Sequence, residues 1–135
     1  MYCNINKILI KHKNEFIKIK DHPYYQALKN NDPKIYENTI KLSKTQSSKN
    51  TGSWMGFLNL KDVILEHGIH YVCQEELIQI KKLDDINFYC HHGRHRLCIL
   101  YFLYYTTIKL KIENNLCIGF KIKYNLYTTI KIKLK

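Results

Sequence analysis

An abrupt change of pattern at Gly93 constrains the fold more than any other feature of the sequence. Residues 86–90 predict a strand, whereas the largely apolar run 97–105 predicts a helix that is buried on most sides. Glycine permits a positive φ and lets a ligand oxygen approach the backbone, so Gly93 suits the short connection between them. A chain of 135 residues with such a junction is predicted to form a single α+β domain.

Both arginines of the chain, Arg94 and Arg96, follow this glycine, although the sequence contains 22 lysines and arginines in total. The planar guanidinium grips a phosphate or carboxylate bidentately, which lysine cannot reproduce. A helix N-terminus adds unpaired backbone N–H groups and a favourable dipole. Gly93, Arg94, His95 and Arg96 are therefore candidate phosphate ligands, with two or three hydrogen bonds of about 1.5–3 kcal/mol each.

A plainer alternative is compatible with the same residues. Arg94 and Arg96 would then pair with acids such as Asp84 or Asp85, and His95 would pack in the core. Basic turns that contain glycine are common, so local chemistry leaves both interpretations open.

The string GRHRLCIL at 93–100, placed after a predicted strand, resembles the GxHR or GxRR box of the ParB/sulfiredoxin superfamily. Segments 57–68 and 77–80 resemble the helix and strand that precede this box. Residues 21–28 are similar to an N-terminal extension of ParB-like proteins found near surface-modification genes. The resemblance implies a small domain that binds a nucleotide of the ATP or CTP type, with or without Mg²⁺, through its box.

Three residues depart from the patterns of that superfamily. His92 stands where an Asp often precedes the box glycine, and Arg94 stands where sulfiredoxins have their catalytic Cys. His95 replaces an Arg of the chromosome-partition proteins, and no helix-turn-helix pattern follows it. Sulfinic-acid reduction and DNA segregation are therefore not expected.

Whether the chain is an enzyme stays open. A small-molecule kinase or phosphohydrolase would need an acid to hold Mg²⁺, and Glu75, Glu76 and Asp85 lie in loops that could reach the box. His92 is a candidate general base near neutral pH. Acids in loops are more often simply solvated, so these four residues are only candidates for catalysis.

The Cys and His residues between 90 and 98 are crowded, and His67, His70 and Cys73 add further donors. Strand alternation separates His91 from its two neighbours, and the sequence contains no C-x₂-C pair. No metal site is predicted.

The domain is predicted to have three parts: an N-terminal extension (1–53), a ParB-like core (54–105) and a lysine-faced β extension (106–135). The extension should contain a hairpin over 5–20 with the turn Lys11–Asn14, then helices at 24–28 and 33–43 and a polar loop at 44–53. Asp21 or His22 can cap the first helix, and Pro23 fits its first position.

The core is predicted to begin with an amphipathic helix that starts near Asn59 and stops at Gly68. The last thirty residues alternate Ile or Leu with Lys, with a period of two that is typical of half-buried strands. A β-meander is therefore expected, with strands at 108–112, 120–123 and 130–134.

The formal net charge of +11 favours anionic partners, but lysines spread along the whole chain are more often a solvated face than a binding groove. The expected partner is a nucleotide or phosphorylated small molecule. Binding or cleavage of nucleic acid by the basic C-terminal strands remains an alternative. The sequence shows no apolar run of membrane-spanning length and no signal peptide, so a cytoplasmic protein is expected, and its oligomeric state is undetermined.

Overall fold

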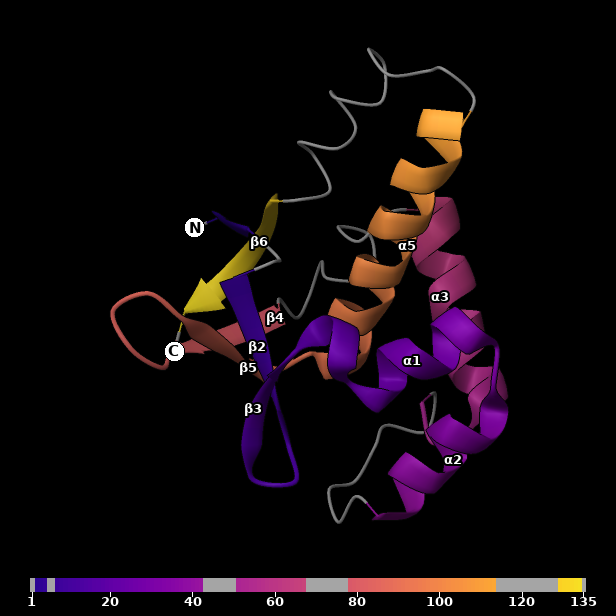
Figure 1. The fold of residues 1–135 in the computed structure, drawn as a ribbon, viewed down its shortest axis with the longest axis horizontal. Coiled ribbons are helices and arrows are strands. Elements are labelled where there is room, and N and C mark those ends of the chain that lie inside the picture. Colours follow the sequence, from indigo (N-terminus) through magenta and orange to yellow (C-terminus); the bar gives the residue numbers. More distant parts are fainter. Residues whose placement is uncertain (1, 5–6, 43–50, 68–77, 114–128, 135) are drawn as a thin grey trace.

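The computed structural model describes residues 2–4, 7–42, 51–67, 78–113 and 129–134, with side chains described in 7–42, 51–67 and 78–103 (Figure 1). The described strands are β1 (Tyr2–Asn4), β2 (Ile8–His12), β3 (Glu15–Lys18), β4 (Ile78–Lys82), β5 (Phe88–His92) and β6 (Thr129–Leu134). The described helices are η2 (a 3-10 turn, Ile19–Asp21), α1 (Pro23–Asn30), α2 (Pro33–Leu42), α3 (Trp54–His67) and α5 (Arg94–Glu113). The predicted α+β class is confirmed.

The described strands form one mixed sheet in the order β1-β6-β4-β5-β2-β3. β5 is central, since it pairs with β2 in parallel and with β4 antiparallel. The N-terminal hairpin is therefore part of the main sheet, because β2 joins it directly to the strand that leads into Gly93.

The helices α1, α2, α3 and α5 lie together on one side of the sheet (Figure 1). Alternate residues of the strands are buried towards them, as the period of two requires. The buried sheet residues are Ile8, Ile10, Ile78, Ile80 and Cys90, and α5 adds the continuous buried run 97–101. This all-round burial of the start of α5 agrees with the prediction from its apolar sequence.

The hairpin was predicted correctly, but its turn is shorter than expected. Lys11 and His12 belong to β2, and only Lys13 and Asn14 connect the strands, with φ values of 49° and 65°. Two consecutive residues with positive φ match the right-handed twist of a tight hairpin. As a result, His12 lies at the end of a strand rather than in a solvated loop.

The start of α1 is also as predicted. His22 is its N-cap and accepts a hydrogen bond from the Tyr24 backbone N–H at 3.1 Å, while Pro23 occupies the first turn. Asn31 ends the helix in the left-handed conformation with φ of 49°. The helix predicted at 33–43 is present as α2.

The start of one helix differs from the prediction. α3 begins at Trp54 and not near Asn59, and the side chain of Ser53 accepts a hydrogen bond from the Gly56 N–H at 3.1 Å. Ser53 thus caps the helix one turn earlier than the apolar pattern indicates. The predicted stop at Gly68 lies outside the described residues.

The predicted strand at 108–112 is wrong, because these residues continue α5 as far as Glu113. No Gly or Pro interrupts the chain from Arg94 to Glu113, and extending an existing helix costs far less than starting a new element. The strand near 130–134 is present as β6, but it pairs with β1 and β4, so the expected meander is also wrong at this point. The strand predicted at 120–123 lies outside the described residues.

None of the helices in the described part of the chain combines the length and the apolar composition that crossing a bilayer requires.

Candidate functional site

The strand–glycine–helix junction exists, and its geometry requires glycine. Gly93 connects β5 to α5 with φ of +98°, and its carbonyl accepts the Leu97 N–H at 2.9 Å. A Cβ at this position would lie 3.1 Å from Ile78 Cγ1 and 3.3 Å from Ile78 Cα. The residue is therefore fixed both by its conformation and by the close approach of β4.

Arg96 folds back over the same glycine. Its Nη2 atom lies 3.1 Å from the place that a Gly93 Cβ would occupy. The side chain is only partly exposed, so its guanidinium lies beside the first turn of α5. The N–H groups of a first helical turn have no acceptor within their own helix, so a cation lies beside backbone donors at this point.

Arg94 acts electrostatically on three imidazoles near the junction. Its guanidinium lowers the pKa of His12, His22 and His95, although burial is the larger cause for each imidazole. These three residues come from β2, from the cap of α1 and from α5. Arg94 is half-buried and thus lies where the hairpin, α1 and α5 converge.

His95 does not point into solvent beside the arginines. Its ring stacks on Tyr24 with centroids 4.5 Å apart, and it meets Phe57 edge-on at 5.6 Å. Burial, together with Arg94 and Arg96, lowers the pKa of His95 to about 4. Its Nε2 atom is buried without a hydrogen-bond partner, so the imidazole is neutral and belongs to the core.

His22 is the second buried imidazole near the junction. Its Nδ1 accepts the Tyr24 N–H and lies 4.0 Å from Cys98 Sγ, and its ring meets that of His12 at 5.2 Å. Burial is the main reason that the pKa of His22 falls to about 3. An acceptor at Nδ1 and a low pKa both describe a neutral imidazole with its proton on Nε2.

The thiols near the junction are not poised for nucleophilic chemistry. Burial raises the pKa of Cys90 to about 12 and raises that of Cys98 as well, with Arg94 opposing both shifts only weakly. Cys90 Sγ donates to the His92 carbonyl at 3.4 Å. A thiol that stays protonated is a poor nucleophile and a poor metal ligand.

The candidate catalytic residues are not brought together in the described structure. His92 is exposed at the end of β5, next to Gly93. Asp85 lies in the loop before β5, so the whole strand, about 16 Å long, separates it from Gly93. Glu75 and Glu76 lie outside the described residues.

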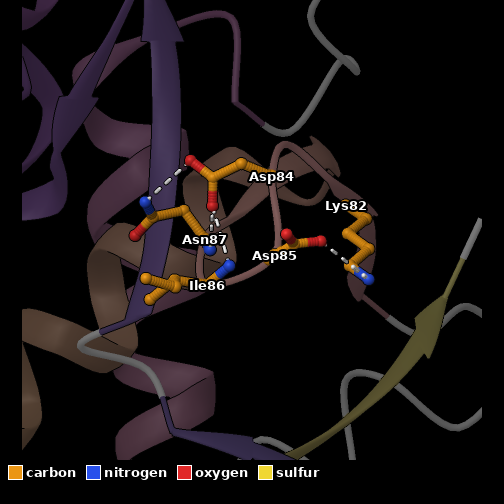
Figure 2. Close-up of polar contacts among 5 residues, drawn as sticks. All are labelled: Lys82, Asp84, Asp85, Ile86 and Asn87. Atoms are coloured by element: carbon orange, nitrogen blue, oxygen red, sulfur yellow. Dashed lines mark hydrogen bonds and ion pairs between the residues drawn. The ribbon is translucent and has the colours of Figure 1, made fainter.

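Figure 2 shows that the two aspartates of this loop make different contacts. Asp84 accepts hydrogen bonds from the Ile86 N–H at 2.8 Å and from Asn87 at both its N–H (2.7 Å) and its side chain (3.1 Å). These bonds lower the pKa of Asp84. Asp85 is fully exposed and forms an ion pair with Lys82 at 3.9 Å (Figure 2). The contacts of Asp84 and Asp85 are thus local, and pairing of these acids with the two arginines is not observed.

Within the described ranges, Cys, His, Asp and Glu side chains do not converge in threes around a point where a metal ion could bind. His70 and Cys73 lie outside those ranges.

Sequence patterns do not single out three residues that lie near the junction. His12 falls in the predicted turn Lys11–Asn14, and Tyr24 and Tyr36 fall in the predicted helices at 24–28 and 33–43. Tyr24 and Tyr36 are buried, and their rings contact each other at 5.2 Å. The predicted N-cap role of His22 does indicate its place, because the N-cap residue of a helix lies beside the first turn of that helix.

Comparison of the chain with protein-family models, with curated proteins and with solved structures gives no match.

Proposed function

We propose that the chain binds a nucleotide or another phosphorylated ligand at the junction of β5 and α5. The observation that carries the proposal is the position of Arg96 at the first turn of a twenty-residue helix. Its Nη2 atom lies 3.1 Å from the place that a Cβ on Gly93 would occupy. Backbone donors, the helix dipole and a planar guanidinium there favour the same ligand, an anion with several acceptor oxygens.

Arg94 adds a second guanidinium to the junction. Burial lowers the pKa of His12, His22 and His95 and Arg94 adds to each shift, so near neutral pH these rings are neutral while the guanidinium stays charged. A phosphate would therefore meet guanidinium groups held among neutral rings, where the local dielectric strengthens the attraction. In this proposal His95 anchors the first turn through its stack on Tyr24 and does not contact the ligand.

The α+β fold with a strand–Gly93–helix junction is compatible with a ParB/sulfiredoxin-like architecture, which we propose as the family. A kinase or phosphohydrolase would also need an acid beside the phosphates. Asp85 lies at the far end of β5, so it gives that alternative no support. We therefore propose ligand binding and assign no reaction.

The test is a thermal-shift titration with nucleoside diphosphates, nucleoside triphosphates and inorganic phosphate, each with and without Mg²⁺. At a hundredfold excess over Kd, a bound ligand stabilises the fold by about 2.7 kcal/mol. Arg94→Lys and Arg96→Lys keep the charge but lose the bidentate fork, so each should weaken binding by about tenfold. Lys29→Gln, on the exposed surface of α1, should not change it.

Two results would contradict the proposal. One is that none of these ligands raises the melting temperature of the wild-type protein. The other is that the two arginine variants bind as tightly as Lys29→Gln, because binding would then not depend on the guanidinium groups of the junction.

A further inference from the structure

We propose that the outer face of the sheet is a docking surface for single-stranded nucleic acid. This face is opposite to the helices and separate from the junction at Gly93. The side chains of Ile8, Ile10, Ile80 and Cys90 are buried on the helix side. The residues that alternate with them therefore point to the other face.

The register of the strands places two aromatic side chains together on this outer face. Lys11 pairs with Phe16, while Leu9 pairs with both Lys18 and Tyr89. The rings of Phe16 and Tyr89 are in contact, with centroids 4.9 Å apart and planes inclined by 55°. Phe16 remains 38% exposed, which is unusual for a large aromatic side chain in a central position of a β-hairpin.

Lysines surround this aromatic pair on three strands. Lys11 is on β2, Lys18 is on β3, and Lys81 is on β4, where it is the register partner of Tyr89. The acid in strands β2 to β5 is Glu15, and it pairs with His12 on the helix side. In the described part of the chain, these three lysines form no ion pair.

On the outer face of strands β2 to β5, as far as the structure describes them, lysines without acids lie around an exposed ring. Such a face suits one kind of partner. Lysines attract the phosphate backbone, and each base offers a π-face to an aromatic side chain. In a duplex the faces of the bases are stacked on neighbouring base pairs and cannot stack on Phe16 or Tyr89. A single strand can contact both the lysines and the aromatic rings, so it is the better fit. By register the surface can extend towards β6, where Lys133 is the partner of Gln79.

The test is fluorescence anisotropy of a labelled twelve-nucleotide oligothymidine and oligouridine at several salt concentrations. The charge variant combines Lys11→Gln, Lys18→Gln and Lys81→Gln. Its matched control combines Lys29→Gln, Lys34→Gln and Lys41→Gln, which remove the same charge from exposed positions on α1 and α2. Circular dichroism and melting curves verify that both variants are folded.

We expect the outer-face variant to bind at least tenfold more weakly than its control. Its salt dependence, the slope of log K against log [salt], should be smaller by about 2, because each phosphate contact to a single strand contributes about 0.7. Phe16→Ala should weaken binding by about fivefold or more through the loss of stacking. Leu42→Ala, a truncation of an exposed apolar side chain on α2, should not.

Three outcomes would overturn the proposal: no binding of either oligonucleotide, equal losses in the two triple variants, or tighter binding of a duplex of the same length. Binding of the wild type only to anionic lipid vesicles would instead assign the face to a membrane surface. All variants in this test keep Arg94 and Arg96. Failure of the outer-face proposal would therefore leave the proposed phosphate site at Gly93 untouched.

Discussion

The imidazole of His95 stacks on the phenol ring of Tyr24, with centroids 4.5 Å apart and planes inclined by 21°. Tyr24 in turn meets the ring of His22 at 4.7 Å, so a row of rings connects the first turn of α5 to the cap of α1. The row is buried, and burial, with Arg94 as a smaller cause, lowers the pKa of both imidazoles and keeps them neutral.

Acidification should therefore destabilise the fold. The pKa is about 4 for folded His95 and about 3 for folded His22, against an ordinary value of 6.5. Between these values the unfolded chain binds more protons, so the free energy of unfolding falls as pH drops below about 6.5. The expected slope is roughly 1.4 kcal/mol per pH unit for each imidazole. Urea unfolding between pH 7.5 and pH 4.5 measures it.

His95→Phe separates this effect from general acid sensitivity. The variant keeps the stack on Tyr24, removes a buried Nε2 atom without a partner, and should be as stable as the wild type at pH 7.5. Its stability should fall less steeply on acidification. Lys29→Gln, which changes an exposed lysine on α1, is the control and should keep the wild-type slope. Equal slopes for all three proteins would contradict the assignment.

Gly93→Ala should destabilise the protein by about 1–3 kcal/mol, because a side chain at φ of +98° is strained and its Cβ would press on Ile78 and Arg96. Gly52→Ala is the matched control, since Gly52 is exposed and has no positive φ. Chemical denaturation compares the two. A similar small change in both variants would show that the junction tolerates a side chain.

The sequence predicted most of the local structure around the site. The hairpin, the cap at His22 and the strand–Gly93–helix junction all depend on residues close in sequence, where turn chemistry and periodicity act directly. It did not predict where α5 ends, because alternating Ile and Lys over five residues satisfies a strand and also continues a helix. Helix propagation then decided the outcome at 108–112.

The residues that form the site come together through contacts between positions far apart in the sequence. His95 was expected to bind a ligand, yet it lies against Tyr24, which is 71 positions earlier and belongs to another helix. The aromatic pair Phe16 and Tyr89 likewise forms only when β2 lies between β3 and β5. Such contacts are set by the strand order, which periodicity alone does not determine.

The loop before β5 offers a comparison between adjacent aspartates. Asp84→Ala removes three hydrogen bonds that close the turn to Asn87 and Ile86, so it should lower the urea midpoint. Asp85→Ala removes one exposed ion pair with Lys82 and should leave the midpoint almost unchanged. A larger effect of Asp85→Ala would contradict this division of roles. It would also reopen a functional role for that carboxylate.

The Tyr36 hydroxyl joins α2 to the segment that precedes α3, because it donates to the backbone carbonyl of Thr51. Both residues are buried, so Tyr36→Phe removes a buried hydrogen bond and should cost about 1–3 kcal/mol. The ring itself would stay stacked on Phe57 at 4.4 Å, so packing should be retained. Urea unfolding measures the loss, and hydrogen exchange should locate it near Thr51.

Tyr89→Phe is the matched control for Tyr36→Phe. Its hydroxyl makes no hydrogen bond in the described part of the chain, and its ring would keep the contact with Phe16. The free energy of unfolding should therefore change by less than about 0.5 kcal/mol. If both variants lost the same stability, the buried hydroxyl of Tyr36 would have no special role in holding the segment at Thr51.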